Sequence, residues 1–337
     1  MKSKPDISII VANFNGEKYL KETIHSLQNL KIASYEIIIV DDASTDNSRK
    51  ILSAYKKHPH IKILLEDANR GPAVTRNLGA KTARGDVLLF MDMDCRIHNG
   101  SVRQVLDEFA RYKKTGGIIY KLVNAKTKLL DYSGAFLSAI GLPYEAGSSQ
   151  NPALFRKRLK TFGVKTAAYA IRKNIFARIG GFDEDYKIHG EDFDLAWRVR
   201  LAGYENIFLP TATGVHHQKG SYSAKTSDLI FYEGTKNNLS NLIKNLPFRD
   251  LCYLVPSYLI FHVFLMTTLT IRGNIHASRL IGSGIVWNLS HINRTLKKRK
   301  KVLEYSVRYT PELYKIMFGP LQPKDIIMKG LRWIRSI

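Results

Sequence analysis

Strand-like and helix-like segments alternate through the first hundred residues of this 337-residue chain. Short runs rich in Ile, Val and Leu are separated by longer segments whose apolar residues recur at helical spacing. Such alternation predicts an α/β fold, a mostly parallel sheet with helices on both faces. The predicted strands are DISIIVANF (6–14), YEIIIVDDAS (35–44), IKILLED (61–67) and GDVLLFMDMD (85–94).

Polar residues collect where these predicted strands end. Asn13 ends the first strand, Asp41 and Asp42 end the second, and Asp92 and Asp94 end the fourth. In open parallel sheets, ligands bind outside the carboxyl ends of the strands. A single aspartate there would be read as a turn or capping residue, but three strand ends at one edge indicate a binding site.

Asp92 and Asp94 form an Asp-x-Asp pair directly after the buried run VLLF. In extended chain, residues two apart point to the same face, so the two carboxylates can converge on one divalent cation. Such a cation would neutralise charge on a departing diphosphate. The pair fits Mg²⁺ and Mn²⁺ alike, and an additional histidine ligand would favour Mn²⁺.

The character of the chain changes near residue 235. Leu251 to Ile271 carries no charge and is long enough to span a bilayer, although Pro256 and His262 dilute it. Apolar and basic residues then mix in KKRKK (297–301) and DIIMKGLRWIRSI (325–337), as in helices that lie in a membrane interface. We expect a first domain at 1–233 and a helical, membrane-associating region at 234–337, embedded in the interface rather than spanning. An ordinary helical subdomain with a solvated basic face is the alternative.

Charge and cysteine content narrow the possible functions. The formal net charge is +23, and the last 44 residues contain twelve Lys and Arg but three acidic residues. A clustered cationic end indicates a polyanionic partner: nucleic acid, an anionic membrane or a phosphorylated lipid. The two cysteines, Cys95 and Cys252, support neither a disulfide framework nor a structural zinc site, which favours a reducing compartment.

Seven motifs together carry a family resemblance: VANFNGEKYL, VDDASTDNS, NRGPAVTRNLGA, FMDMD, GGFDE, HGEDFDLAWRVRLAGY and VHHQKGS. In this order, over residues 6–222, they resemble the large inverting glycosyltransferase family commonly called family 2. The resemblance implies a GT-A (Rossmann-like) fold and a nucleotide-diphosphate sugar donor. The chain after residue 235 is similar to the membrane-associating tails of the rhamnosyltransferase-like branch. A QxxRW motif is absent after GED, which favours transfer of one or a few sugars over processive synthesis.

The resemblance also implies roles on the donor side. Ala12 and Asn13 would lie against the nucleotide through their backbone, and Asp42 would accept hydrogen bonds from the pyrimidine or ribose. Arg76 would approach the diphosphate, and Asp92 would hold the ribose or the metal.

For the metal and the chemistry, the resemblance implies a second group of residues. Asp94 would be the main metal ligand, completed by His216 or His217. Asp192 would be the general base, with Glu191 orienting acceptor or sugar hydroxyls. Inverting displacement needs a base that takes the proton of the attacking hydroxyl on the face opposite the leaving diphosphate. Because Asp192 stands at a predicted helix start, we expect the helix dipole to lower its pKa and keep it ionised.

The leading hypothesis is a metal-assisted inverting glycosyltransferase at the cytoplasmic face of the cell membrane, peripheral or monotopic. It would move a sugar from dTDP-rhamnose or a UDP-hexose to a lipid-linked glycan acceptor, recognised by residues 116–165, and bind no nucleic acid. A basic nucleic-acid-binding protein with a Rossmann-like core is an alternative, but no known binding motif accompanies the charge. A nucleotidyltransferase would need a Gly-rich basic first loop, where NFNGEKYL stands. An NAD-dependent oxidoreductase would need G-x-G-x-x-G at that place.

Overall fold

The computed structural model describes residues 4–30, 32, 34–217, 224–307 and 309–319, with backbone alone at 224–227. Within these residues nine strands form one sheet and two more form a separate hairpin. The strands are β1 (Ile7–Asn13), β2 (Tyr35–Asp41), β3 (Ile61–Leu65), β4 (Val87–Asp92), β5 (Cys95–Ile97), β6 (Thr115–Asn124), β7 (Gly134–Leu137), β8 (Pro143–Ala146), β9 (Leu159–Thr161), β10 (Ala168–Arg172) and β11 (Glu205–His216).

The large sheet is mostly parallel, as predicted. Its order is β3-β2-β1-β4-β10-β6-β11-β5, with β9 also paired to β11. Parallel pairs join β1 to β2 and β4, β2 to β3, and β6 to β11, whereas β10 lies antiparallel between β4 and β6. The four strands predicted from the first hundred residues are β1 to β4, so their carboxyl ends meet at one edge.

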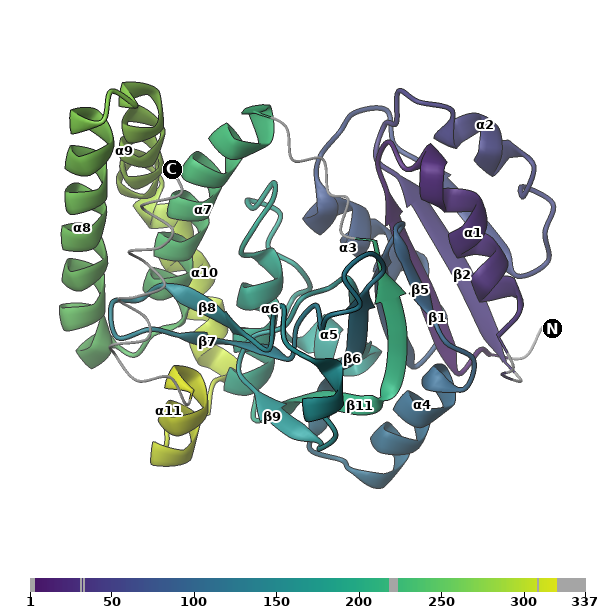
Figure 1. Ribbon diagram of the computed structural model, residues 1–337. Coiled ribbons are helices and arrows are strands. Elements are labelled where there is room, and N and C mark those ends of the chain that lie inside the picture. Colours follow the sequence, from purple (N-terminus) through teal and green to yellow (C-terminus); the bar gives the residue numbers. More distant parts are fainter. Residues whose placement is uncertain (1–3, 31, 33, 218–223, 308, 320–337) are drawn as a thin grey trace.

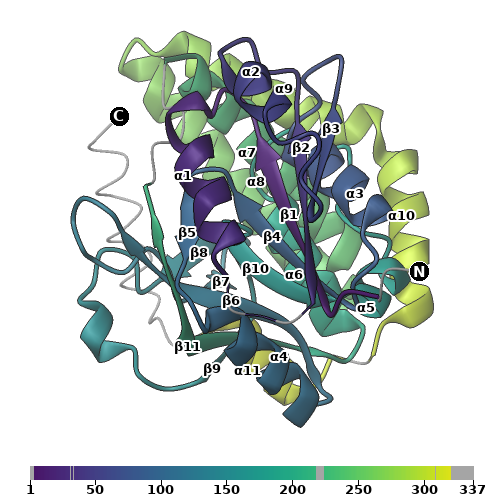
Figure 2. The same cartoon turned by 90° about the vertical axis from the view of Figure 1, so that its right-hand side faces the viewer.

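Helices cover both faces of the sheet. They are α1 (Glu17–Gln28), α2 (Ser48–Ser53), α3 (Pro72–Thr82), α4 (Ser101–Arg111), α5 (Lys173–Arg178), α6 (Glu191–Leu201), α7 (Ala224–Asn245), α8 (Phe248–Ile271), α9 (Ile275–Ser290), α10 (Ile292–Tyr305) and α11 (Pro311–Phe318), with a 3₁₀ turn at Pro152–Leu154. Alternate strand residues serve alternate faces: Ile10 and Phe90 pack with α3, α5 and α6, whereas Ile9 and Met91 pack with α1 and α4. Figure 2 shows α1 and α3 on opposite sides of β1.

The C-terminal helices share the core of the sheet domain. Leu239 and Leu242 of α7 and Leu254 of α8 belong to the same buried cluster as Trp197 of α6. Helix α7 separates the sheet from α8 and α9, which form the outer layer on that side (Figure 1). The predicted domain limit between residues 233 and 234 falls inside α7, where the chain is continuous helix.

Part of the basic run at 297–301 faces inward. Lys298 pairs with Asp183 and lies 2.5 Å from Asp185, and Arg299 Nη1 donates to the carbonyl of Leu246 at 2.5 Å. These two cations hold α10 against the sheet domain and the end of α7, so they are not part of a free basic surface. The segment 325–337, expected to be amphipathic, and residues 218–221 of VHHQKGS lie outside the described residues.

Candidate active site

The carboxyl ends of β1 and β2 form a buried polar cluster. Asn13 Nδ2 donates to Asp41 Oδ1 at 2.7 Å and to Ser44 Oγ at 3.2 Å, and Asp41 also pairs with Arg49 at 2.9 Å. The Asn13 side chain is therefore used inside the protein, and its carbonyl accepts the backbone N–H of Asp42 at 2.9 Å. A backbone contact from Asn13 to a nucleotide stays a prediction. Ala12 is half-buried and lies in register between Val40 and Asp92 on the neighbouring strands.

Asp42 shapes the loop that leads into α3. Its two carboxylate oxygens accept the backbone N–H groups of Arg70 and Gly71, each at 2.8 Å. Gly71 has φ +90, and a Cβ there would lie 2.2 Å from the carbonyl oxygen of Lys187. Only glycine fits this position, because the loop before α3 touches the loop before α6. Each oxygen of Asp42 thus already accepts one N–H, so a nucleotide would use its second lone pair.

Arg76 joins the donor side to Glu191, the neighbour of the predicted base Asp192. This buried side chain of α3 donates from Nη2 to Asp92 Oδ1 at 2.8 Å and from Nη1 to Glu191 Oε1 at 3.0 Å. Burial by itself lowers the pKa of Arg76, but the carboxylates of Asp92 and Glu191 outweigh it and raise that pKa. Residues 115 positions apart in the chain are thereby held in one cluster.

Asp92 and Asp94 do not face the same way. Strand β4 ends at Asp92, and Asp94 lies in the turn that follows, so the extended geometry assumed from the sequence is wrong. Asp92 turns to Arg76, whereas Asp94 Oδ1 lies 3.3 Å from His216 Nε2. Ligand atoms of Asp94, His216 and Cys95 all lie within 4.8 Å of one another. This cluster could hold a metal ion, and Asp92 stands beside it.

His216 has the orientation of a metal ligand. Its Nδ1 lies 2.7 Å from Asp131 Oδ2, which fixes the ring and directs Nε2 towards Asp94. Burial raises the pKa of the Cys95 thiol to about 12 when no metal is bound, and a coordinating metal would lower it again. The carboxylate of Asp94 and the imidazole of His216 fit Mn²⁺, and the Cys95 sulfur lies within reach as a third donor.

His217 is directed elsewhere. Its ring lies tilted against that of Tyr19, with 4.9 Å between centroids, and its Nε2 lies 2.9 Å from Arg96 Nη2. Of the two histidines predicted for the metal sphere, the structure therefore places His216 in the cluster and His217 outside it.

Asp192 differs from the expectation in its acidity. It lies in the first turn of α6 and accepts the backbone N–H of Phe193 at 2.7 Å. Burial, followed by the negative charge of Glu191, raises the pKa of Asp192 to about 7. The predicted lowering of this pKa is wrong, because removal from water and the charge of Glu191 outweigh the opposing charges of Arg76 and Lys165 and the hydrogen bond from Phe193. A carboxyl with this pKa is a stronger base than a solvent-exposed aspartate.

The irregular segment 116–165 contributes residues that no motif marked. Lys165 Nζ lies 2.9 Å from Glu145 and 3.9 Å from Asp131, and its positive charge acts on Asp192. The hydroxyl of Tyr132 is buried without a hydrogen-bond partner among the described residues. No spacing or motif in the sequence distinguishes these four residues from an ordinary surface insertion.

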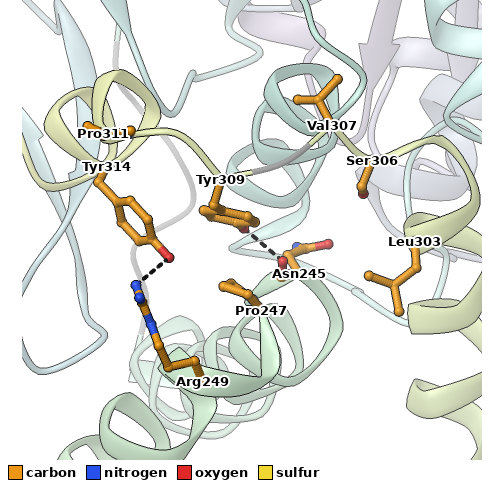
Figure 3. A pocket seen from close by; sticks show the side chains of 9 residues that line it. All are labelled: Asn245, Pro247, Arg249, Leu303, Ser306, Val307, Tyr309, Pro311 and Tyr314. Atoms are coloured by element: carbon orange, nitrogen blue, oxygen red, sulfur yellow. Dashed lines mark hydrogen bonds between the residues drawn. The ribbon is translucent and has the colours of Figure 1, made fainter.

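A cavity of about 800 Å³ lies away from this cluster, between the α7–α8 junction and the chain from α10 to α11 (Figure 3). There Tyr309 donates to the carbonyl of Asn245 at 2.8 Å, and Arg249 donates to Tyr314 at 3.3 Å. None of the predicted site residues lines this cavity. The converging titratable groups, rather than cavity size, locate the candidate active site.

Comparison with known families supports the motif resemblance. The family model described as Glycosyl transferase family 2 matches residues 8–179. A probable glycosyltransferase of Bacillus subtilis, YdaM, is 26% identical over 223 residues, which cover 63% of this chain and 50% of that protein. The chain spans half or less of the length of the curated relatives that it matches here.

Solved structures share the fold. A mannosyltransferase from Pyrobaculum calidifontis, solved with GDP-Man and Mn²⁺, has a TM-score of 0.54 at 15% identity, covering 90% of this chain and 86% of that one. Staphylococcus aureus TarS, solved with UDP-GlcNAc, has a TM-score of 0.54 at 17% identity, covering 89% and 91%. The predicted GT-A fold is confirmed by these likenesses together with the family match.

Proposed function

Because the chain belongs to glycosyl transferase family 2, we propose that it transfers a sugar from a nucleotide-diphosphate donor to an acceptor hydroxyl, with inversion at the anomeric carbon. The observation that carries this proposal is the Arg76 bridge between Asp92 and Glu191. It joins the strand ends, where a nucleotide would bind, to the acidic start of α6, where a base would act.

In this proposal Asp192 takes the proton of the attacking hydroxyl. Its raised pKa of about 7 suits a general base, since efficiency is greatest when the pKa lies near the working pH. Glu191 is held by Arg76, so it stays in place beside the base and can orient a hydroxyl. The base is thus set at one end of the cluster and the donor at the other.

Asp94 and His216 would hold Mn²⁺ or Mg²⁺, with Asp92 beside them. The bound cation would neutralise charge on the leaving diphosphate. Asp131 keeps the His216 ring oriented for this task. For the donor we propose dTDP-rhamnose or a UDP-hexose, which follows the motif resemblance to the rhamnosyltransferase-like branch.

We further propose a lipid-linked glycan acceptor, reached from the cytoplasmic face of the cell membrane. Helix α8 is long and apolar enough to cross a bilayer, and 28% of its most apolar stretch is buried within the described structure. The large exposed side chains of α8 and α9 are Phe248, Tyr253, Ile260, Val263, Phe264, Ile271, Ile275, Val286 and Leu289. Burying such side chains in a membrane interface is favourable, whereas in water they are a liability. Beside them, a cavity of about 330 Å³ runs between Leu142, α7 and α8.

Calorimetric binding of UDP, dTDP and GDP, each with and without Mn²⁺, tests the donor site. We expect one nucleotide to bind in a metal-dependent way in the wild type and not in Asp94→Ala. The matched control is Asp107→Ala, an exposed acidic residue of α4, which should bind as the wild type does. Absence of binding under every condition would refute the transferase proposal.

Flotation with anionic liposomes tests the membrane proposal. Wild type should float, and a variant with Ile260, Val263 and Phe264 changed to serine should float at least tenfold less. Equal flotation of both would assign binding to charge alone, and no flotation of either would refute membrane association.

A further inference from the structure

The turn that leads into α6 has an unusual backbone. His189 has φ +63 and Gly190 has φ +83, so two consecutive residues are left-handed. Glycine adopts this region freely, but histidine does so at a cost. Such a turn persists only where its surroundings hold it. Glu191 and Asp192 follow it directly, so the turn decides where both carboxylates lie.

Helix α7 holds the carbonyl groups of this turn. Asn237 Nδ2 lies 3.0 Å from the carbonyl oxygen of Ile188 and 2.6 Å from that of His189. Asn241 Nδ2 donates to the carbonyl of Gly190 at 3.2 Å. Three successive carbonyls thus receive side-chain donors from one helix, and the carbonyl of Gly190 also accepts the backbone N–H of Asp194 at 3.0 Å.

The donor groups of α7 are themselves fixed. Asn237 is fully buried, and its Nδ2 also lies 3.2 Å from Glu233 Oε2, which in turn accepts the backbone N–H of Lys187 at 3.3 Å. A Cβ built on Gly190 would lie 3.2 Å from the Cβ of Asn237, so the helix and the turn are in close contact. Loss of the Asn237 amide would therefore free the carbonyls of Ile188 and His189, while Asn241 would still hold the carbonyl of Gly190.

The Asp192 carboxylate has little else to hold it. Within the described part of the chain, it accepts one hydrogen bond, from the backbone N–H of its neighbour Phe193. That bond travels with the turn and does not tie Asp192 to the rest of the site. The position of the base therefore depends on the backbone of residues 188–190.

We propose that Asn237, assisted by Asn241, is a positioning residue that holds the left-handed turn and thereby sets the Asp192 carboxylate against the acceptor hydroxyl. This inference rests on the proposed function of Asp192 as the base. It gives the C-terminal helices a task in catalysis besides any contact with a membrane.

The fold has other anchors for α7, so Asn237 can be removed without releasing the helix. Lys244 pairs with Asp183 at 2.6 Å and with Asp194 at 2.8 Å. Lys244 stands at the C-terminal end of α7, beyond the two asparagines that reach the turn. Ser240 donates to Asn288 of α9 at 2.7 Å. Ser240→Ala is the matched control, because it removes one buried hydrogen bond from the same helix without touching the turn.

The test compares Asn237→Ala with Ser240→Ala at a pH well above 7, where Asp192 is ionised. Displacing a catalytic group by about an ångström can cost on the order of 100-fold in rate. We expect kcat of Asn237→Ala to fall 10- to 100-fold, with nucleotide affinity unchanged within twofold. Ser240→Ala should keep both values within twofold of wild type. Equal kcat in the two variants, or a parallel loss of nucleotide affinity in Asn237→Ala, would overturn the proposal.

Amide hydrogen exchange separates this proposal from the proposed function. Asn237→Ala should lose at least tenfold protection over residues 188–194, and Ser240→Ala should not. If wild type transfers no sugar, the proposed function fails, while the exchange data still decide whether Asn237 holds the turn. Unchanged protection in Asn237→Ala would overturn the inference even if the enzyme is active.

Discussion

Replacing Asp192 by asparagine should stabilise the protein while abolishing its activity. Burial, followed by the charge of Glu191, raises the pKa of Asp192 from 3.8 to about 7. The ionised carboxylate is therefore less favourable in the folded protein than in the unfolded chain. A gap of roughly three pH units corresponds to about 4 kcal/mol, at 1.36 kcal/mol for each. Asparagine has the same shape without the charge, so the free energy of unfolding should rise by up to this amount.

The gain should depend on pH. As pH rises through 3.8, the unfolded chain loses its Asp192 proton while the folded protein keeps it, so wild-type stability falls until pH passes 7. The advantage of Asp192→Asn is thus negligible below pH 3.8, under about 2 kcal/mol at pH 5, and complete at about 4 kcal/mol by pH 8.

Asp194, two residues along the same helix, provides a control of opposite sign. Burial by itself raises its pKa, but Arg198 and Lys244 outweigh it and lower that pKa. Asp194 therefore stabilises the fold above its unfolded pKa and loses this effect on acidification. Asp194→Asn should be less stable than wild type at pH 8, with a smaller difference at low pH.

Urea unfolding, followed by tryptophan fluorescence at pH 5 and pH 8, measures all three proteins. A loss of stability in Asp192→Asn at pH 8 would refute the reasoning. So would a gain of the same size at both pH values, because the effect would then not arise from the charge.

Three further predictions concern the site. The kcat/KM of the wild type should rise about tenfold per pH unit below pH 7 and level off above it, since Asp192 must lose its proton to act; a pH profile that is flat between 5 and 7 would contradict this role. Asp131→Asn should weaken Mn²⁺ binding by about 10- to 100-fold in calorimetry, because the His216 ring loses its carboxylate partner. Gly71→Ala should lower the free energy of unfolding by about 1–3 kcal/mol through backbone strain, and the contact of the new Cβ with Lys187 should lower it further. An unchanged urea midpoint in this variant would contradict the prediction, because the loop would then have moved aside.

The sheet could be predicted from the sequence because it rests on local signals. Each of the first four strands is a buried apolar run that ends in polar residues, and Asn13, Asp42 and Asp92 mark the edge where they meet. Both periodicity and strand ends can be read within windows of about ten residues.

The remaining features depend on contacts between distant residues. The pKa of Asp192 follows from burial, which a helix-start pattern does not reveal. Asp131 orients His216 across 85 positions of sequence, and its own segment has no periodicity. Asp92 and Asp94 were expected to converge because the chain was taken as extended, whereas the strand stops at the first of them. The partners of His217 could not be inferred either, since adjacent residues usually diverge in a strand.

Side chains of α7 and α10 hold the loop before α6, and this arrangement determines when the loop can be fixed during synthesis. The strands and Asp192 leave the ribosome first, but Asn237 and Lys298, which secure the residues from Asp183 to Gly190, come up to about a hundred residues later. At about 5–20 residues per second, this delay lasts on the order of 5–20 s. A nascent chain arrested near residue 222 would thus carry every family motif and still lack a fixed base, which hydrogen exchange on such arrested chains can check.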